Sequence, residues 1–559
     1  MSEGTIQAQK LRTGVQQAEV LTESLEQKLI NLFATSENSA AALRKIEDKI
    51  DAIAQDFLDS IHISTSLDVG SIVNRFQASE IPSSPTDISS YIDYLTDSII
   101  DHSVQISSPR YIGHMTSALP YFFQPLGKLM TAMNQNVVKV ETAKAFSPYE
   151  RQALGMIHRL VYGFGDDFYT QHIQNSESTL GIMTTGGTLA NLTAMWCARN
   201  SALGAKDNFN GIENEGLPAA LDFYGYKGAV IIGSSLMHYS FEKAAGILGI
   251  GDRSLLKIPT DTNHRIDLAA LQQTIEECRQ RQQLIIALVG IAGTTDSGAI
   301  DPLPEMAAIA QKYNIHFHVD AAWGGPVLFS HQNKYKIAGI EQADSVTIDG
   351  HKQLYLPMGI GMVILQNPHL GKLIEKTARY TVRKESIDLG KRSLEGSRPG
   401  MVLFLQAALN IIGHQGYEFL IDSGISKSQY MADIIRQRPE FELLVEPEIN
   451  ILLYRYLPEP FRQKAAQRQL TLADNQSINH FNELLQNAQR QAGEAFVSRT
   501  TLENTYYGQG IAIVALRAIL ANPLTTEADI EAVLNDQIQI AAKLPVISVS
   551  QNEVSHDNI

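Results

Sequence analysis

The chain has 559 residues, of which 44% are hydrophobic, enough for more than one packed core. It carries 60 Asp and Glu against 45 Lys and Arg, a net charge of −15, so it lacks the basic surface that nucleic-acid binding requires. Cys197 and Cys278 are the only cysteines and form no C-x-x-C pair. Neither a disulfide framework nor a thiolate metal site is therefore expected.

The same features predict a cytoplasmic protein that is not bound to a membrane. The most apolar stretch, LIIALVGIAG from Leu284 to Gly293, is far too short to span a bilayer. The N-terminal residues MSEGTIQAQK lack the basic and apolar regions of a signal peptide. We therefore expect neither export nor membrane insertion.

Amphipathic helices are predicted near the N-terminus. From about residue 17 to residue 61, apolar residues such as Leu25, Leu29 and Leu32 recur at intervals of three and four. Such helices pack against the body of the protein or against a second subunit. We place this helical N-terminal segment at residues 1–100.

Residues 101–400 are predicted to form a large α/β domain. From about Gly181 onward, short apolar runs alternate with helical stretches, which predicts a mainly parallel central sheet with helices on both faces. Ligands in such sheets bind beyond the carboxyl ends of the strands. The predicted buried strands are GIMTT, AVIIGSS, LIIALVGIAG, IHFHVD, SVTID and GMVIL.

Two of these strands lead into residues that can contact a planar anionic ligand. GIMTT precedes Gly186-Gly187-Thr188 and a helix, whose first N–H groups and Thr188 hydroxyl can bind an anion. An ordinary N-cap is the alternative interpretation. His238 follows AVIIGSS and could stack on a ring, although a structural or surface histidine also fits.

A carboxylate and a lysine follow two later strands. IHFHVD ends at Asp320, which could keep a pyridinium nitrogen protonated or could simply cap the strand end. His316, His318 and Asp320 share one face, so a metal site is an alternative, but no third ligand with suitable spacing is visible and no metal is predicted. Lys352 follows SVTID, where desolvation can leave a neutral amine that forms a Schiff base. A lone lysine, by contrast, is usually solvated.

Other catalytic motifs are absent from the sequence, and the pattern changes near Gly400. There is no G-x-x-x-x-G-K-[ST], no G-x-G-x-x-G after a strand and no G-x-S-x-G, so kinase, dinucleotide and nucleophile-elbow interpretations lose support. Helices and the alternating strands ELLVEP, ILLYRY and AIVALRAIL then predict a small α+β C-terminal domain at 401–543. Residues 544–559 are predicted to be a flexible tail.

The order GGT-x-AN, a histidine after a strand, AGTT, HVDAAW and DGHK resembles the group II pyridoxal phosphate decarboxylases. This family includes glutamate, aromatic amino acid and aspartate decarboxylases, and the resemblance covers about Ser107 to Thr526. The stretches IGHMTSALPYF, HVDAAWGG, DSVTIDGHKQLYLPMGIGMV and LEGSRPG are most similar to bacterial pyridoxal-dependent aspartate 1-decarboxylases. The resemblance implies the fold of fold-type I enzymes and pyridoxal 5'-phosphate as the cofactor.

The resemblance also implies roles for individual residues. Lys352 would carry the cofactor covalently, Asp320 would hold the pyridine nitrogen, and His238 would stack on the ring. Thr295 of AGTT would lie near the phenolic edge of the ring. The cofactor-binding residues implied in this way are Gly187, Thr188, His238, Thr295, Asp320, Ala322, His351, Lys352 and Ser397.

Further implied roles concern the substrate and a second subunit. Ser397 would reach the phosphate from the partner of a homodimer, so the active site would be shared. Arg517 would bind the substrate α-carboxylate, and His114 and Thr116 would lie at the far end of the pocket. The predicted lid loop has Tyr380 at its start but no tyrosine further along, so the residue that donates a proton to Cα is not assigned.

The sequence departs from animal relatives of the family beside the lysine. Asp349 stands where they often have Asn, and Gly350 stands where they often have Pro. The lysine itself stays in place.

The predicted reaction is decarboxylation of an acidic L-amino acid, namely L-aspartate to CO2 and β-alanine, a pantothenate precursor. Glutamate or cysteine sulfinate decarboxylase is the alternative within the family. An aminotransferase with the same lysine and aspartate, and a cofactor-binding regulatory protein without turnover, are the alternatives outside it. The GHK triplet and the long motif match argue against an aminotransferase.

Overall fold

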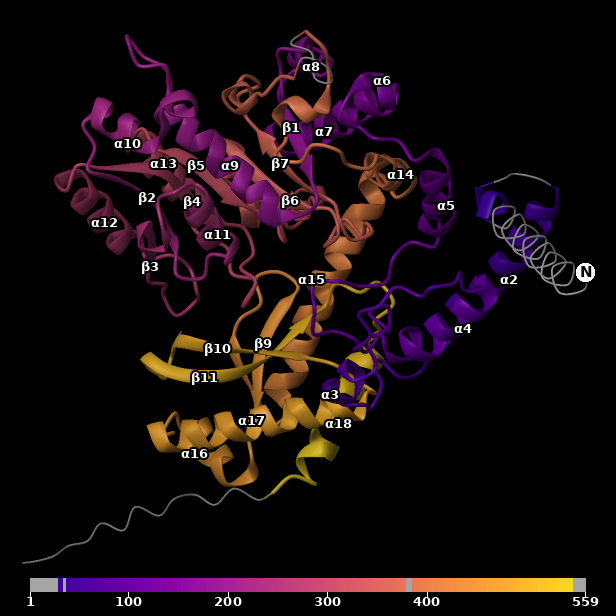
Figure 1. The fold of residues 1–559 in the computed structure, drawn as a ribbon. Helices are drawn as coiled ribbons and strands as arrows, with labels where there is room; N and C mark the ends of the chain where they lie inside the picture. The colour runs from indigo at the N-terminus through magenta and orange to yellow at the C-terminus, as the bar shows by residue number, and fades with distance from the viewer. Residues whose placement is uncertain (1–28, 34–36, 379–384, 546–559) are drawn as a thin grey trace, which may run out of the picture. The chain divides into compact units, whose positions relative to one another are not determined.

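The computed structural model describes residues 29–33, 37–378 and 385–545. The chain divides into two compact units, Met1–Gln105 and Ile106–Ile559, which are described separately (Figure 1). Most of the predicted tail and the predicted helical residues 17–28 lie outside the described ranges, and the predicted domain boundaries stay predictions. Over the described ranges, no helix combines the length and apolarity that a bilayer crossing requires.

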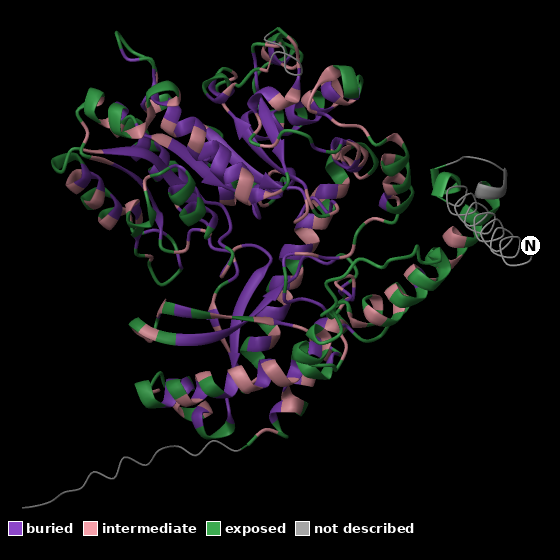
Figure 2. Ribbon diagram, in the orientation of Figure 1, coloured by how far each residue is buried: buried purple, intermediate pink, exposed green. Residues whose placement is uncertain are grey.

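The first unit consists of helices, as the apolar spacing predicts. Its described helices are α2 (Glu37–Asp59), α3 (Val69–Val73) and α4 (Ile88–Ser98). The Asp68 and Asp87 side chains cap α3 and α4 by accepting hydrogen bonds from backbone N–H groups of the first turn. Large apolar side chains stay exposed on α2 and α4, among them Leu43, Ile50, Leu58, Tyr91 and Tyr94 (Figure 2).

The second unit contains two sheets and the helices that cover them. Its helices are α5 (Phe123–Met133), α6 (Val140–Ala143), α7 (Phe146–Tyr162), α8 (Asp166–His172), α9 (Gly187–Ala202), α10 (Ile212–Tyr224), α11 (Ser240–Ile247), α12 (Leu268–Gln280), α13 (Leu303–Tyr313), α14 (Val402–Ile411), α15 (Gly413–Gln437), α16 (Arg462–Ala466), α17 (Leu472–Ala492) and α18 (Glu527–Ala541). Its strands are β1 (Gly181–Thr184), β2 (Gly228–Ser234), β3 (Leu255–Ile258), β4 (Gln283–Ile291), β5 (His316–Asp320), β6 (Ser345–Asp349), β7 (Gly361–Leu365), β8 (Phe441–Val445), β9 (Ile451–Tyr456), β10 (Ser498–Thr505) and β11 (Gly508–Ile519).

The large sheet has seven strands in the order β1-β7-β6-β5-β4-β2-β3. Strands β2 to β6 pair in parallel, and β7 runs antiparallel to both β1 and β6. The predicted α/β fold with a mainly parallel sheet is thus confirmed, including all six predicted strands. Strand β3 was not predicted, because its four residues LLKI are too short and too mixed in polarity to stand out.

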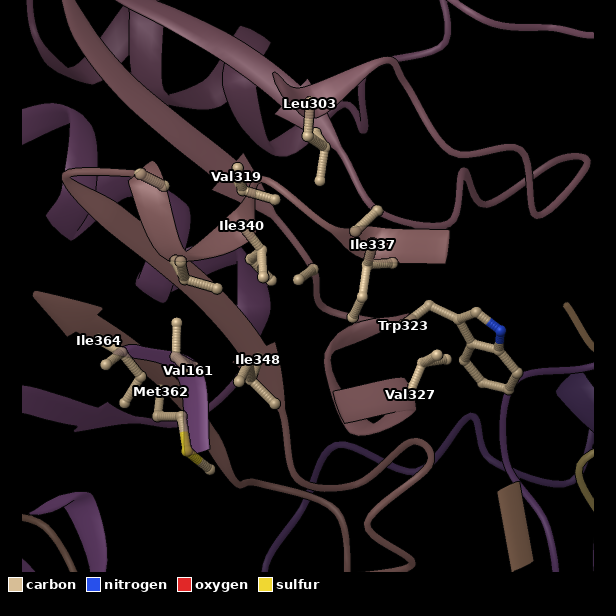
Figure 3. Close-up of a cluster of buried hydrophobic side chains, with 14 of the residues drawn as sticks. Val161, Leu303, Val319, Trp323, Val327, Ile337, Ile340, Ile348, Met362 and Ile364 are labelled. Atoms are coloured by element: carbon tan, nitrogen blue, oxygen red, sulfur yellow. The ribbon is translucent and has the colours of Figure 1, made fainter. Parts of the chain in front are cut away.

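Helices cover both faces of this sheet because its side chains alternate between two buried clusters. In β2, Val230 and Ile232 join a cluster with α7, α12, α13 and α14, whereas Ala229 and Ile231 join a second cluster with α9, α10 and α11. Figure 3 shows the first cluster, to which the neighbouring strands β5, β6 and β7 contribute Val319, Ile348 and Met362. Because strands β2 to β6 run parallel to one another, their carboxyl ends share one edge of the sheet.

The small sheet is antiparallel, with the order β10-β11-β9-β8. One face packs on α15, α17 and α18 through buried residues that include Tyr454, Phe481, Leu516 and Ile530. The strands predicted from ELLVEP, ILLYRY and AIVALRAIL are present as β8, β9 and β11. Strand β10 was missed because its sequence, SRTTLENT, is polar and half exposed.

Candidate active site

A cavity of about 480 Å³ lies beyond the carboxyl ends of β2, β4, β5 and β6. Eleven of the twelve predicted site residues line it, and only Ser397 does not. The eleven are His114, Thr116, Gly187, Thr188, His238, Thr295, Asp320, Ala322, His351, Lys352 and Arg517.

One wall of the cavity is the first turn of α9. Its N-terminal N–H groups and the Thr188 hydroxyl can bind an anion. Neighbouring atoms lie very close to the glycine backbones here. A Cβ on Gly187 would lie 2.7 Å from Asp349 Oδ2, and a Cβ on Gly361 would lie 2.5 Å from the Gly186 backbone. Only glycine leaves the turn open at these positions.

Lys352 lies in the turn after β6, beside a second acidic residue. Its Nζ is 3.3 Å from Oδ2 of Asp349, and Nε2 of His351 is 3.7 Å from the same oxygen. The His351 ring is held by a hydrogen bond of 3.1 Å from Nδ1 to the Ile360 carbonyl. The sequence suggested a lysine affected by desolvation alone, whereas the structure gives it a carboxylate partner.

Asp320 ends β5 and is 6% exposed. Its Oδ2 accepts a hydrogen bond of 2.9 Å from Asn191 Nδ2, and its Oδ1 accepts one of 3.1 Å from the backbone N–H of Ala322. Each oxygen of the carboxylate therefore has a hydrogen-bond donor, and the two bonds fix its orientation.

His316 and His318, which also suggested a metal site, have a different partner. His316 Nε2 and His318 Nδ1 lie 2.8 and 2.9 Å from the same Ser345 hydroxyl oxygen. Within the described ranges, no group of three or more His, Cys, Asp or Glu residues could hold a metal ion.

His238 is half-buried at the cavity wall. Its Nδ1 accepts a hydrogen bond of 3.3 Å from the backbone N–H of Ser240. Burial lowers the pKa of His238, and the negative charge of Asp320 offsets part of that effect. The imidazole is thus neutral, with its proton on Nε2.

Arg517, on β11, contributes the buried cation of the cavity. Its Nη1 donates to Ser498 Oγ at 3.1 Å and reaches the Gly113 carbonyl at 3.5 Å. No group in the described part of the chain accepts a hydrogen bond from Nε or Nη2, although both atoms are buried. Burial lowers the pKa of Arg517 to about 10, so the guanidinium stays charged at neutral pH. A buried charge with unused donors favours an anionic ligand.

Three buried side chains tie this cavity to the small sheet. Trp323 Nε1 donates to Asn450 Oδ1 at 3.0 Å, Asn450 Nδ2 donates to Gln353 Oε1 at 2.7 Å, and Gln353 Nε2 donates to the Trp323 carbonyl at 2.7 Å. Trp323 follows Asp320 in the chain, and Gln353 follows Lys352. We call this closed set of bonds the Trp323 triangle; the indole also borders the cluster in Figure 3.

These groups suit pyridoxal phosphate. The glycine-lined start of α9 matches a phosphate, the amine of Lys352 matches an aldehyde, and the buried carboxylate of Asp320 matches a ring nitrogen. Arg517 leaves unpaired donors for a carboxylate substrate. An α/β fold with this cavity defines a pyridoxal phosphate-dependent enzyme acting on amino acids.

Comparison with known proteins gives the family. A family model described as the pyridoxal-dependent decarboxylase conserved domain matches residues 74–457. The chain belongs to the pyridoxal-dependent decarboxylase family, and it is an amino acid decarboxylase that uses pyridoxal phosphate. The resemblance seen in the sequence is thereby confirmed.

Two relatives and one solved structure illustrate the range of similarity. Aspartate 1-decarboxylase of Aliivibrio fischeri (strain ATCC 700601 / ES114) is 44% identical over 540 residues, which cover 95% of this chain and 98% of the relative. Acidic amino acid decarboxylase GADL1 of Mus musculus is 27% identical over 377 residues, 66% of this chain and 64% of the relative. The crystal structure of mouse CSAD has a TM-score of 0.78 at 23% identity, covers 90% of this chain and 100% of its own, and shows the shared fold.

Some residues of this site were missed in the sequence, and the roles implied for the others stay predictions. Asn191 is part of the GGT-x-AN motif, but the sequence alone did not connect it to Asp320. Asp349 was noted only as a departure from relatives, yet it lines the cavity. Ser397 is exposed and accepts a hydrogen bond of 2.9 Å from Asn136, so its role across a dimer stays a prediction. Tyr380 lies outside the described residues.

Proposed function

We propose that this enzyme decarboxylates L-aspartate to β-alanine and CO2, as a homodimer in the cytoplasm. The observation that carries the proposal is the buried, partly unpaired guanidinium of Arg517 in the same cavity as Lys352 and Asp320. The 44% identical relative, named an aspartate 1-decarboxylase, supports aspartate as the substrate. Glutamate or cysteine sulfinate is the second candidate, supported by the relative named an acidic amino acid decarboxylase.

The proposed roles of the side chains follow from their chemistry. When bound, pyridoxal phosphate draws electrons away from the substrate Cα, so that the Cα–carboxylate bond can break and CO2 can leave. Lys352 Nζ would hold the cofactor through its aldehyde group. The Asp320 carboxylate would hold the ring nitrogen, and the start of α9 would bind the phosphate.

The remaining proposed roles orient the substrate. The neutral His238 imidazole would pack against the cofactor ring. Arg517 binds the α-carboxylate through Nε and Nη2, the two donors that lack a protein partner. Thr295, Ala322 and His351 complete the surroundings of the cofactor.

The distal carboxylate of aspartate needs donors of its own. Among the described residues that line the cavity, Arg517 and Lys352 are the only arginine and lysine, and both already have proposed roles elsewhere. His114 Nδ1 and Thr116 Oγ1 lie 3.0 Å apart in the segment that we assign to the far end of the pocket. Burial, and then the charge of Arg517, lower the pKa of His114, so its imidazole is neutral. The neutral imidazole and the hydroxyl hold two hydrogens; one lies in the bond between them, and the other can be donated to a carboxylate held at one fixed distance.

The enzyme is expected to use aspartate with a kcat/KM at least about a hundredfold above that for glutamate. An extra methylene would move the distal carboxylate away from its donors, which costs more than the ~1–3 kcal/mol of an apolar mismatch. The measurement is amine and CO2 production by the purified enzyme from aspartate, glutamate, cysteine sulfinate and aromatic amino acids. His114→Ala serves as the matched variant and should reduce aspartate turnover more than cofactor affinity.

Equal or better use of glutamate would favour the second candidate. A preference for aromatic amino acids would refute an acidic substrate altogether. If no CO2 were released from any of the tested amino acids, the protein would instead be a cofactor-binding regulatory protein without turnover.

Homodimerisation is expected to be required for full activity. The exposed apolar side chains of α2 and α4 can pack on a second copy, and Ser397 would then contact the partner's phosphate site. Sedimentation velocity of the holoenzyme, with activity measured across the gradient, should place the activity in the dimer. A fully active monomer would contradict the shared site.

A further inference from the structure

Four hydrogen bonds link Asp320, at the cavity, to His316 at the other end of β5. Asn191 Nδ2 contacts Asp320 Oδ2 at 2.9 Å, and Asn191 Oδ1 contacts His318 Nε2 at 3.1 Å. His318 Nδ1 contacts Ser345 Oγ at 2.9 Å, and Ser345 Oγ contacts His316 Nε2 at 2.8 Å. The line crosses from α9 to β5 and β6, where His318 and Ser345 are paired in the sheet.

The donors and acceptors along this line have one consistent order. Asn191 Nδ2 also reaches Ser240 Oγ at 3.0 Å, so both amide hydrogens are used and Asn191 Oδ1 must accept. His318 Nε2 therefore carries a hydrogen. Burial lowers the pKa of His318 to about 3, so the ring is neutral and its Nδ1 accepts from the Ser345 hydroxyl. The Ser345 oxygen in turn accepts from His316 Nε2, and every donor points toward Asp320.

The line is shielded from water along its length. The side chains of His318 and Ser345 are fully buried, and Asn191 is 1% exposed. The Phe241 ring lies edge-on to His318 at 5.9 Å. Hydrogen bonds in such surroundings are stronger than in water and polarise one another. At the outer end, His316 Nδ1 is 3.9 Å from a carboxylate oxygen of Asp344.

We propose that Asn191, His318, Ser345 and His316 form an ordered relay that keeps the Asp320 carboxylate oriented toward the ring nitrogen of the cofactor. These are positioning residues, since they act through Asp320: His316, His318 and Ser345 lie outside the cavity lining, and Asn191, which is part of it, bonds to Asp320. The inference rests on the proposed role of Asp320. It also gives the alternating histidines of HFHVD a function that needs no metal.

The test compares the affinity of the apoenzyme for two ligands. One is pyridoxal phosphate, and the other is its analogue with carbon in place of the ring nitrogen, which has nothing for Asp320 to hold. His318→Leu removes the donor to Asn191 at similar volume, and His318→Gln restores a donor. Dissociation constants are measured by absorbance and fluorescence titration, so the readout does not depend on turnover.

His318→Leu should weaken binding of pyridoxal phosphate by about tenfold, the equivalent of ~1.4 kcal/mol and within the range for one intramolecular hydrogen bond. Its affinity for the carbon analogue should change less than about twofold, because the relay acts only through the ring nitrogen. His318→Gln should recover most of the loss. Equal losses for both ligands would show that His318 has only a structural role and would overturn the proposal.

Two further measurements keep the proposal testable if His318→Leu fails to fold. Ser345→Ala removes one relay hydroxyl with little change in volume and should show the same ligand dependence. The nitrogen-15 spectrum of histidine-labelled apoenzyme should show His318 with hydrogen on Nε2 only. Hydrogen on Nδ1 would contradict the order of the relay.

Failure of the proposed reaction would look different. If the wild-type enzyme bound both ligands as expected but did not release CO2 from aspartate, the substrate assignment would fall. The ligand comparison would still decide whether the relay acts on Asp320.

Discussion

Lys352→Ala is expected to abolish covalent attachment of pyridoxal phosphate and to lower kcat about a thousandfold or more, a loss of ~4 kcal/mol. Lys352 is the one lysine among the described residues that line the cavity. Lys352 lies in the turn after β6, and its Nζ is 3.3 Å from Oδ2 of Asp349. No other amine of this cavity can replace it.

Borohydride reduction of the holoenzyme followed by peptide mapping measures the attachment directly. The label should appear on Lys352 in the wild-type enzyme and nowhere in the variant. Lys257→Ala provides a matched control, because Lys257 is exposed and pairs with Glu242 outside the cavity. A pyridoxyl label on any other lysine would refute the assignment.

Asp320→Asn is expected to lower kcat at least about a hundredfold, a loss of ~2.7 kcal/mol, because a neutral amide does not stabilise positive charge on the ring nitrogen. The substitution also places the NH2 group of asparagine beside a hydrogen-bond donor, with which it cannot form a hydrogen bond. Both carboxylate oxygens accept hydrogen bonds, from Asn191 and from the Ala322 N–H, and an asparagine has one acceptor oxygen only.

Steady-state kinetics with aspartate would measure the loss, and circular dichroism with thermal melting would show that the fold is retained. Asp252→Asn, at an exposed carboxylate outside the cavity, serves as the control. Turnover within about tenfold of the wild-type value, ~1.4 kcal/mol, would reduce Asp320 to a strand cap.

The location of the site could be predicted because it follows from topology. Parallel strands bring their carboxyl ends to one edge, so residues after GIMTT, AVIIGSS, IHFHVD and SVTID had to meet there. The apolar runs that form these strands are long and uniform enough to stand out. The resemblance to a family then gave the residues roles that strand spacing alone left open.

The remaining features depend on how elements pack. Side chains alternate along a strand, which places His316 and His318 on one face of β5. Only the register with β6 shows that Ser345 lies between them. The link from Asn191 to Asp320 depends on the rotation of α9 over the sheet. Arg517 pairs with Ser498 because β11 and β10 are antiparallel, and β10 was not predicted.

The Trp323 triangle limits how far Arg517 can move away from Lys352 and Asp320. Asn450 lies three residues before Leu453, which pairs with Arg517 across β9 and β11, while Trp323 and Gln353 lie next to the segments that carry Asp320 and Lys352. The guanidinium of Arg517, which we propose to bind one end of the substrate, is therefore connected by buried hydrogen bonds to the segments of Lys352 and Asp320. A hinge opening between the two sheets would have to break buried hydrogen bonds. We therefore expect the pocket to select substrates by their length. A change of substrate preference by mutation would start from the segment around His114.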